Sequence, residues 1–357
     1  MNDINQIMKT LSHPEKIAFT TLIKNYSKDV ENLIIFIVPS ADLVGGGILS
    51  IYSLYEESRK LTHIHGSKVL MCTLPKDAIL LKNTRFENDV PIYPFDLIPK
   101  YFSKLRKCIF HIPEIFVGIF KFFMADYYSY LSALPDLQIN ILNQNIELMP
   151  DVHVINELKK FTVNITCTTA HERYTTRELR EAIGIPLHKF STFISPEQYK
   201  SLDYIHKENL MVVSPDDHPL KSNIIDLIKR NFPAINIVII QDLTYEDYKE
   251  LISRAKWALT FGEGLDGYFI ETVFSGGISF SAYNDKFFTS EFKNLKTVYL
   301  NYDQLVNEIC NDLKNLDNEH NFKQYQKEQL FIIKKYYDYK EYVKNVERFY
   351  KKKYTFR

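Results

Sequence analysis

A continuous apolar run followed by a loop and a helical pattern occurs in both halves of the chain. In the first half, residues 33–38 are all apolar, and a helical pattern runs over 48–60. An unbroken apolar run rich in β-branched residues is typical of a parallel strand covered on both faces. The alternation predicts an α/β domain with a mainly parallel sheet. Further strands of this sheet are expected at 69–74, 108–110, 139–142 and 161–166.

The second half repeats the arrangement and predicts a second α/β domain. The polar stretch 195–207 separates the halves, so two domains with a cleft between them are expected, over 1–195 and 206–335. The end of the chain, over 321–354, is predicted to be long, helical and basic. The other expected elements are strands at 210–213, 235–240, 257–260, 278–280 and 297–300, and helices at 223–231 and 245–255.

Glycine is scarce, and eight of the 11 glycines lie in two clusters that follow expected strands. Glycine is needed where the backbone takes positive φ or lies very close to another group. Open α/β sheets bind ligands at the carboxyl ends of their strands. Tight turns alone would also explain either cluster, but two of them, one in each half, favour a ligand held between the domains. The clusters are Gly45, Gly46 and Gly47, and Gly262, Gly264, Gly267, Gly276 and Gly277.

Several function classes are disfavoured. The chain has neither the G-x-G-x-x-G dinucleotide fingerprint nor a G-x-x-x-x-G-K-[ST] phosphate loop, which argues against nicotinamide enzymes and P-loop NTPases. The 357 residues contain 44 Lys+Arg and 44 Asp+Glu. A net charge of zero excludes nucleic-acid binding by overall positive charge, and no nucleic-acid partner is expected.

A reducing cytoplasm fits the cysteine pattern. The four cysteines form no C-x-x-C pair, so neither a disulfide framework nor a structural zinc site is expected. The N-terminal residues lack the apolar core of a signal peptide, and no stretch has the roughly 18–20 apolar residues that cross a bilayer. We therefore expect a soluble cytoplasmic protein. The cysteines are Cys72, Cys108, Cys167 and Cys310.

The second glycine cluster contains two glutamates, Glu263 and Glu271, separated by seven residues. A helix beginning near Asp266 or Gly267 places Glu271 in its first turns and leaves Glu263 in the preceding loop. Both carboxylates can then face a cleft, beside N–H groups at a helix N-terminus that suit a phosphate. Ionised carboxylates accept hydrogen bonds from paired hydroxyls, so one suits a ribose diol and the other a sugar.

This segment resembles the E-x7-E element of retaining glycosyltransferases with the GT-B fold. The glutamates follow a strand and precede the turn Ser275, Gly276 and Gly277, as in that family, and the two α/β halves match as well. The resemblance implies two Rossmann-like domains facing across a cleft, an N-terminal one for the acceptor and a C-terminal one for a nucleotide-diphosphate sugar. It also implies that the helix at 336–357 crosses back onto the N-terminal domain.

The resemblance also implies roles for individual residues in the C-terminal half. Glu271 would hold the ribose hydroxyls, and Glu263 would contact the transferred sugar as a catalytic residue. Backbone groups near them would approach the sugar or the phosphates, at Gly262, Gly264, Leu265 and Asp266.

In the N-terminal half, Gly45, Gly46 and Gly47 would approach the pyrophosphate or the acceptor. His111 resembles a cleft histidine that some family members place near the donor sugar. A structural histidine with satisfied ring nitrogens explains His111 equally well.

Negative charge develops on the leaving diphosphate, so the site needs a cation. Family members usually supply an arginine and a lysine after the first strand of the C-terminal half. Lys221 can fill the lysine role, but Ser214 and Pro215 stand where the arginine is expected. Transfer without a metal and without a further cofactor is implied, because no Asp-x-Asp element stands at a strand end.

The last 35 residues, from Lys323 onward, carry 11 basic and four acidic residues with interleaved aromatics. A terminal helix with a packed aromatic face explains this pattern. Attraction to an anionic membrane surface is the functional alternative, and a lipid-linked acceptor would make it useful.

These features predict a retaining glycosyltransferase acting on a glycan or lipid-linked acceptor. The Ile-, Lys- and Asn-rich composition suggests bacterial surface polysaccharide synthesis. The alternative is a non-catalytic GT-B-like subunit that binds and stabilises a partner transferase, which the missing arginine favours. A sugar-nucleotide epimerase or a glycan phosphorylase on the same architecture is a third possibility. The paired carboxylates of glycoside hydrolases fit less well, because the glycine pattern has no counterpart there.

Overall fold

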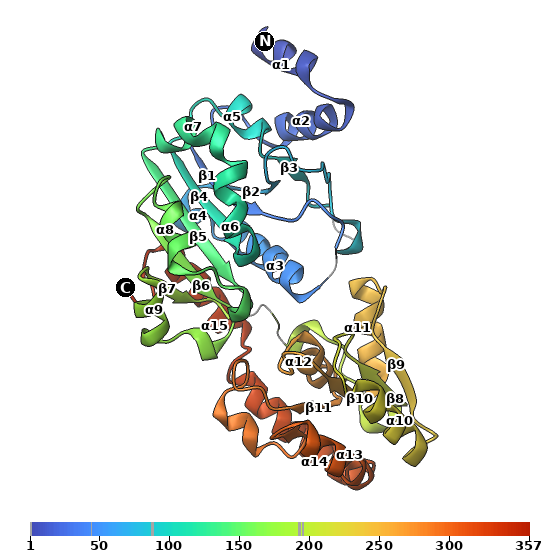
Figure 1. The fold of residues 1–357 in the computed structure, drawn as a ribbon. Coiled ribbons are helices and arrows are strands. Elements are labelled where there is room, and N and C mark those ends of the chain that lie inside the picture. Colours follow the sequence, from blue (N-terminus) through green and yellow to red (C-terminus); the bar gives the residue numbers. More distant parts are fainter. Residues whose placement is uncertain (1, 44, 87–88, 192–193, 195) are drawn as a thin grey trace. The chain divides into compact units, whose positions relative to one another are not determined.

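A computed structural model of the chain describes residues 2–43, 45–86, 89–191, 194 and 196–357. These residues form two compact units (Figure 1). Unit 1 comprises residues 1–191 and 341–357, and unit 2 comprises residues 192–340. The final segment therefore belongs to the N-terminal unit. Ser195, where the sequence places the end of the first domain, lies outside the described residues.

Unit 1 is built on a seven-stranded parallel sheet in the order β3-β2-β1-β4-β5-β6-β7. Strands β2 and β3 follow on one side of β1, and β4 to β7 follow on its other side. This is the strand order of a dinucleotide-binding fold with one strand added. The order reverses between β1 and β4. The strands are β1 (Asn32–Ile37), β2 (Lys68–Thr73), β3 (Ile92–Pro94), β4 (Lys107–Pro113), β5 (Asp136–Asn143), β6 (Ile165–Thr169) and β7 (Leu187–Lys189).

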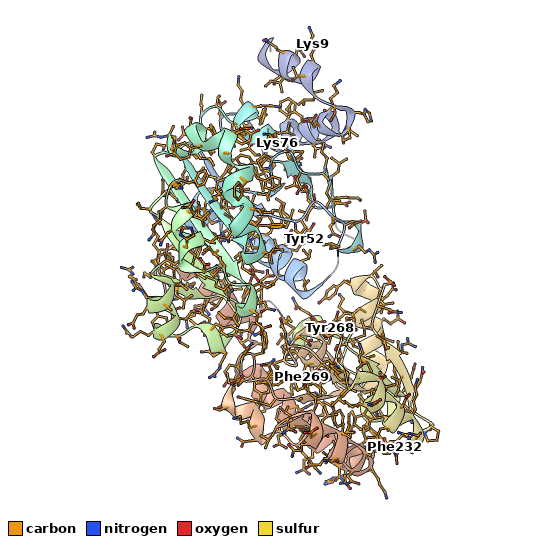
Figure 2. All side chains as sticks on the ribbon, in the orientation of Figure 1. Lys9, Tyr52, Lys76, Phe232, Tyr268 and Phe269 are labelled. Atoms are coloured by element: carbon orange, nitrogen blue, oxygen red, sulfur yellow. The ribbon has the colours of Figure 1, made fainter. Side chains whose placement is uncertain are left out.

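The central strand β1 is buried from Leu33 onward, as its unbroken apolar sequence predicts. Side chains fill the space between the sheet and its helices (Figure 2). The helices before the unit 2 segment are α1 (Asn2–Thr10), α2 (His13–Asn25), α3 (Gly46–Lys60), α4 (Thr62–His65), α5 (Leu97–Tyr101), α6 (Glu114–Phe123), α7 (Tyr128–Ser132), α8 (Val152–Leu158) and α9 (Arg177–Ile183).

Unit 2 has a five-stranded parallel sheet in the order β12-β11-β10-β8-β9. Here the order reverses between β8 and β10. The strands are β8 (Glu208–Val213), β9 (Asn236–Ile239), β10 (Ala255–Thr260), β11 (Ile278–Ala282) and β12 (Val298–Tyr299). The helices are α10 (Lys221–Asn231), α11 (Tyr245–Arg254), α12 (Gly267–Phe274), α13 (Tyr302–Leu316) and α14 (Glu319–Lys334).

The last helix, α15 (Tyr339–Tyr350), packs on unit 1. The ring Nε2 of His188 lies 2.7 Å from the carbonyl oxygen of Asn345, and Phe356 pairs with Leu187 at the sheet edge. The aromatic side chains Tyr342, Phe349 and Tyr350 of α15 are buried. Their burial favours packing as the explanation of the aromatic residues at the end of the chain.

The helical end expected over 321–354 consists of two helices, because α14 ends at Lys334 and α15 begins at Tyr339. The two helices bury their apolar faces in different units, and a sequence period does not reveal that change of partner. Two short strands, β3 and β7, were also not expected. Each has only three residues, and β6 begins four residues later than expected.

None of the helices in the described part of the chain combines the length and the hydropathy that a membrane-spanning segment needs.

Candidate functional site

The candidate site in unit 2 lies where its strand order reverses, at the carboxyl ends of β8 and β10. Such a reversal opens a crevice between the two loops that leave the strands, and ligands of open α/β sheets bind there. Ser214 ties the loops together, because its Oγ accepts a hydrogen bond from the Phe261 N–H at 2.9 Å. Its own N–H donates to the carbonyl of Leu259 at 3.0 Å. Ser214 is buried, so its side chain holds the two loops together and is not itself on the surface of the crevice.

Lys221 supplies the cation of this edge and is the first residue of α10. Its Nζ donates to the carbonyl oxygens of Ser214 and Asp216, both at 2.8 Å, and lies 5.7 Å from the centre of the Phe261 ring. These bonds use two of the three ammonium donors and hold the half-buried side chain in place.

Gly264 is required by the loop that follows β10. Its φ is +78°, and an added Cβ would lie 2.6 Å from Ser281 Oγ and 2.8 Å from the Phe288 ring. Thr260 Oγ1 donates to the Gly264 carbonyl at 2.8 Å and fixes the loop. Gly262, in the same loop, is exposed.

Gly276 closes the other end of α12 with φ of +85°, and an added Cβ would lie 2.7 Å from Ser201 Oγ. The second glycine cluster thus serves tight backbone packing around one helix.

The helix α12 begins at Gly267, as the sequence predicts. Asp266 is its N-cap residue and accepts a hydrogen bond from the Phe269 N–H at 3.0 Å. Burial raises the pKa of Asp266, and the nearby carboxylates of Asp216, Glu263 and Glu271 raise it further, while the Phe269 bond lowers it. Leu265 is buried beneath the loop.

Glu271 lies in the interior of unit 2 with 3% of its surface exposed. Burial raises the pKa of this carboxyl to about 7, against the opposing effect of the Tyr248 and Tyr199 hydroxyls and of Lys249. Although the Tyr248 phenol lies beside it, neither Tyr248 Oη nor Glu271 Oε2 completes a hydrogen bond with the described residues. Tyr199 Oη is 2.9 Å from Tyr245 Oη. Buried carboxylate oxygens in native proteins usually accept a hydrogen bond, and the Tyr248 and Tyr199 hydroxyls are near enough to Glu271 to lower its pKa in this way.

The site is more acidic than the sequence alone suggested. The carboxylates of Asp216, Glu263 and Glu271 all lie near enough to Asp266 to raise its pKa, and the Lys221 ammonium contacts the backbone of the same loop at Asp216. The arginine that the resemblance implies is absent, and Asp216 Oδ2 is buried without a partner among the described residues. Within the described ranges, no three His, Cys, Asp or Glu side chains are placed to hold a metal ion.

In unit 1, the first glycine cluster begins α3 beside the point where the strand order reverses. Gly47 lies close to Gln144, because an added Cβ would be 2.6 Å from Gln144 Oε1. Gly45 and Gly46 have neither a left-handed φ nor a protein atom within 4 Å of an added Cβ, so no contact within the described chain requires glycine there, and the approach of a ligand to this cluster stays a prediction.

Glu114 was not among the expected residues, although it directly follows β4 at the same edge. Its Oε1 accepts hydrogen bonds from the backbone N–H groups of Gln144 and Asn145 at 3.2 and 2.9 Å. Its Oε2 is buried without a partner in the described chain, and burial raises its pKa. A lone glutamate after a short apolar run gives no sequence signal of these contacts.

His111 lies within β4 and is fully buried, rather than following the strand. Its Nδ1 accepts from Asn140 Nδ2 at 3.0 Å, its Nε2 is 3.1 Å from Tyr350 Oη, and its ring stacks on Phe36. Burial lowers its pKa to about 3, so the ring is neutral. Both nitrogens are satisfied inside the core, which favours the structural explanation over contact with a donor sugar.

Comparison with known proteins gives the fold. HepE from Anabaena in complex with UDP-glucose aligns over 90% of this chain and 99% of its own, with a TM-score of 0.60 and 10% identity. The sucrose-phosphate synthase of Thermosynechococcus elongatus covers 90% and 99%, with a TM-score of 0.55 and 11% identity. An α-glucosyltransferase solved with UDP and DNA covers 90% and 99%, with a TM-score of 0.58 and 10% identity.

The chain has the GT-B fold. Units 1 and 2 are its two Rossmann-like domains, and α15 is the helix that returns to the first of them. No protein-family model matches the sequence, and no curated protein matches it.

Proposed function

We propose that the protein is a glycosyltransferase that binds a nucleotide-diphosphate sugar through unit 2. The observation that carries this proposal is the buried carboxylate of Glu271, held in the helix that follows β10, beside the point where the strand order of a GT-B domain reverses. A ribose offers two adjacent hydroxyl donors, which match the acceptor-only chemistry of an ionised carboxylate. The E-x7-E spacing places Glu263 before the helix and Glu271 within it, as in the family that the segment resembles.

The remaining groups are each assigned to one part of the nucleotide-sugar donor. The third donor of Lys221 and the N–H groups at the start of α12 are suited to the diphosphate. Glu263, in the loop before the helix, is assigned to the hydroxyls of the transferred sugar, with backbone groups of Gly262, Gly264 and Leu265 near it.

We propose retention of configuration without a metal. The bond from the anomeric carbon to the diphosphate breaks, the acceptor oxygen forms its bond on the same face, and the acceptor proton passes to the leaving phosphate. No protein base is then needed. The acceptor is proposed to be a glycan or a lipid-linked glycan of a bacterial surface, and contact with an anionic membrane remains part of this proposal.

A second candidate is a non-catalytic GT-B-like subunit that stabilises a partner transferase. The buried carboxylate of Asp216 favours it, because this charge opposes a diphosphate in the loop where the resemblance implies an arginine. The two candidates differ in whether unit 2 binds a nucleotide.

Thermal denaturation with UDP, GDP, dTDP, CMP and ADP separates these candidates, in parallel for the wild type and Glu271→Ala. UDP is tested first because HepE was solved with UDP-glucose. A ligand at 100 times its Kd stabilises by about 2.7 kcal/mol. We expect one nucleotide to raise the melting temperature of the wild type but not that of Glu271→Ala. We also expect the wild type to hydrolyse the sugar conjugate of that nucleotide slowly. Stabilisation without sugar release or transfer would favour the non-catalytic subunit, and no stabilisation by any nucleotide would contradict donor binding.

A further inference from the structure

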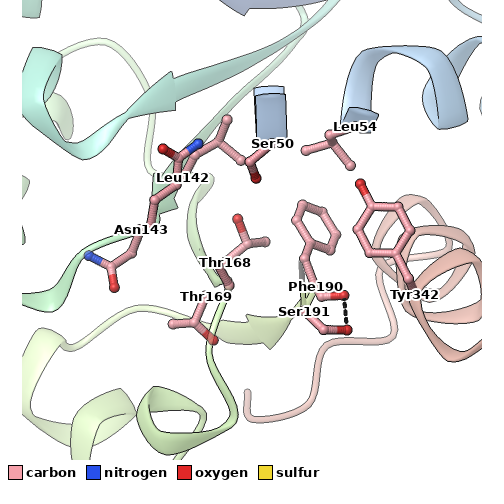
Figure 3. Close-up of a pocket in the computed structure, with 11 residues that line it drawn as sticks. Ser50, Leu54, Leu142, Asn143, Thr168, Thr169, Phe190, Ser191 and Tyr342 are labelled. Carbon is pink, nitrogen blue, oxygen red and sulfur yellow. Dashed lines mark hydrogen bonds between the residues drawn. The ribbon is translucent and has the colours of Figure 1, made fainter. Parts of the chain in front are cut away.

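A hollow in unit 1 is lined by side chains of α3, of the sheet and of α15 (Figure 3). Its volume of about 20 Å³ is room for about one water molecule, so an organic ligand does not fit it. A stronger candidate for binding lies on the outer surface of unit 1, on helix α6.

Helix α6 is apolar on both of its sides. Its inner side, with Val117 and Phe120, belongs to the core of unit 1. Its outer side carries Ile115, Ile119 and Phe122, which are 54%, 40% and 69% exposed. Residues spaced by three and four positions lie on one face of a helix, so these three side chains form one stripe. A helix that is apolar all round is normally buried on all sides, and we therefore expect this stripe to have a partner.

Gly118 lies in the middle of the same outer face and is exposed. Glycine in a helix interior is less favourable than alanine, and it usually has a packing or functional reason there. Nothing in the described chain lies within 4 Å of an added Cβ at Gly118, and its φ is not left-handed. No contact of this chain therefore requires the glycine, whereas a second backbone crossing the helix at close range would require it.

The charges beside this stripe argue against an anionic membrane as its partner. Helices that lie on such membranes carry Lys or Arg on a polar face, available to the lipid headgroups. Lys121, the basic residue of α6, instead donates to Glu157 of the neighbouring helix α8 at 2.8 Å. Glu157 also accepts from Lys160 at 2.9 Å. The exposed residues of α6 itself carry no charge, so the apolar surface of another protein molecule suits them better.

The stripe is complementary to a second copy of itself. Gly118 stands three residues after Ile115 and four before Phe122. When two copies of α6 cross antiparallel at Gly118, Phe122 of each copy meets Ile115 of the other, as a two-fold axis requires. The stripe exposes on the order of 300 Å² in one copy, which is the size of apolar patches that are often functional. Two copies with their polar rims would bury on the order of 1,000 Å², the lower limit for a specific interface.

We propose that the protein forms a reversible dimer in which α6 packs antiparallel against α6 of a second copy. The small area implies weak association, with a Kd on the order of 10 µM. This inference does not depend on the proposed transferase function, because it uses only the outer face of unit 1.

Sedimentation velocity of the full chain over about 1–200 µM brackets this Kd and measures the dimer. Phe122→Ser removes the most exposed side chain of the stripe, and Phe331→Ser is its matched control, because Phe331 is 66% exposed on α14 of unit 2. We expect the wild type and Phe331→Ser to dimerise alike, and Phe122→Ser to raise the Kd by about tenfold or more. The melting temperature of Phe122→Ser should stay at the wild-type value, which shows that the variant is folded.

Gly118→Ala separates dimer formation from folding. Alanine is the better helix former, so the melting temperature of this variant should rise by about 2–4 °C. Its Cβ stands at the crossing point, so the same variant should weaken the dimer by about tenfold.

A wild type that stays monomeric over the whole concentration range, or a dimer that either α6 variant leaves unchanged, would overturn the proposal. Co-sedimentation with vesicles of anionic lipid is measured in parallel. A monomeric wild type that binds these vesicles, with binding lost in Phe122→Ser, would assign the stripe to a membrane instead.

Discussion

Replacing Glu271 with glutamine should stabilise the ligand-free protein at alkaline pH while it weakens nucleotide binding. Burial raises the pKa of Glu271 from 4.5 to about 7. Between these values the folded state holds a proton that the unfolded state has released. The free energy of unfolding therefore falls as the pH rises through this window, and the cost of the buried charge is complete above pH 7. Glutamine keeps the shape of the side chain and carries no charge at any pH.

The magnitude follows from the size of the pKa shift. The difference between 4.5 and about 7 corresponds to about 3 kcal/mol at pH 8. For a domain of the size of unit 2, about 3 kcal/mol raises Tm by roughly 6–12 °C. The gain should shrink towards zero below pH 4.5, where the wild-type carboxyl becomes protonated in both states.

Thermal denaturation of the wild type and Glu271→Gln at pH 5 and pH 8, without ligand, measures this gain. Glu250→Gln is the control, because Glu250 is an exposed carboxylate on the neighbouring helix α11. Its change should stay within about 0.5 kcal/mol at both pH values. A Glu271→Gln protein that is less stable than wild type at pH 8, or that differs equally at both pH values, would refute the reasoning.

Three further predictions concern other parts of the account. Asp216→Asn removes a negative charge from the loop that Lys221 contacts and should tighten UDP binding by about tenfold, or ~1.4 kcal/mol, in calorimetry; unchanged or weaker binding would argue against a diphosphate there. Gly276→Ala should cost about 1–3 kcal/mol in denaturant unfolding, because φ is +85° and the new Cβ meets Ser201; an unaltered midpoint would contradict this contact. Burial lowers the pKa of His111 from 6.5 to about 3, so the unfolded state takes up a proton first as the pH falls. The free energy of unfolding therefore decreases below pH 6.5, by about 2 kcal/mol at pH 5. His111→Asn should flatten that acid limb, and an unchanged slope would show that His111 does not titrate as described.

The fold was largely predictable because buried parallel strands leave continuous apolar runs. The runs that became β1 and β10 each end at a loop that holds glycine, and the start of α12 follows from Asp266 and Gly267. These are local features, set by residues within one or two turns of each other. The E-x7-E spacing is equally local, so the positions of Glu263 and Glu271 relative to that helix could be read before the structure.

What surrounds those residues could not be read, because it comes from distant segments. Tyr199 and Tyr248 approach Glu271 from the segment before β8 and from α11, and only the folded sheet brings them together. The burial of His111 depends on Asn140 and on Tyr350, which lies 239 residues further along the chain. No spacing rule reports contacts of this range.

Hydrogen exchange of backbone amides with and without UDP tests the central claim most directly, because it locates the nucleotide as well as detecting it. The account predicts slower exchange at residues 214–221 and 261–271 in the wild type, and loss of that protection in Glu271→Ala. UDP binding that leaves both segments unchanged, or protection that survives in Glu271→Ala, would contradict a donor site at this edge of unit 2.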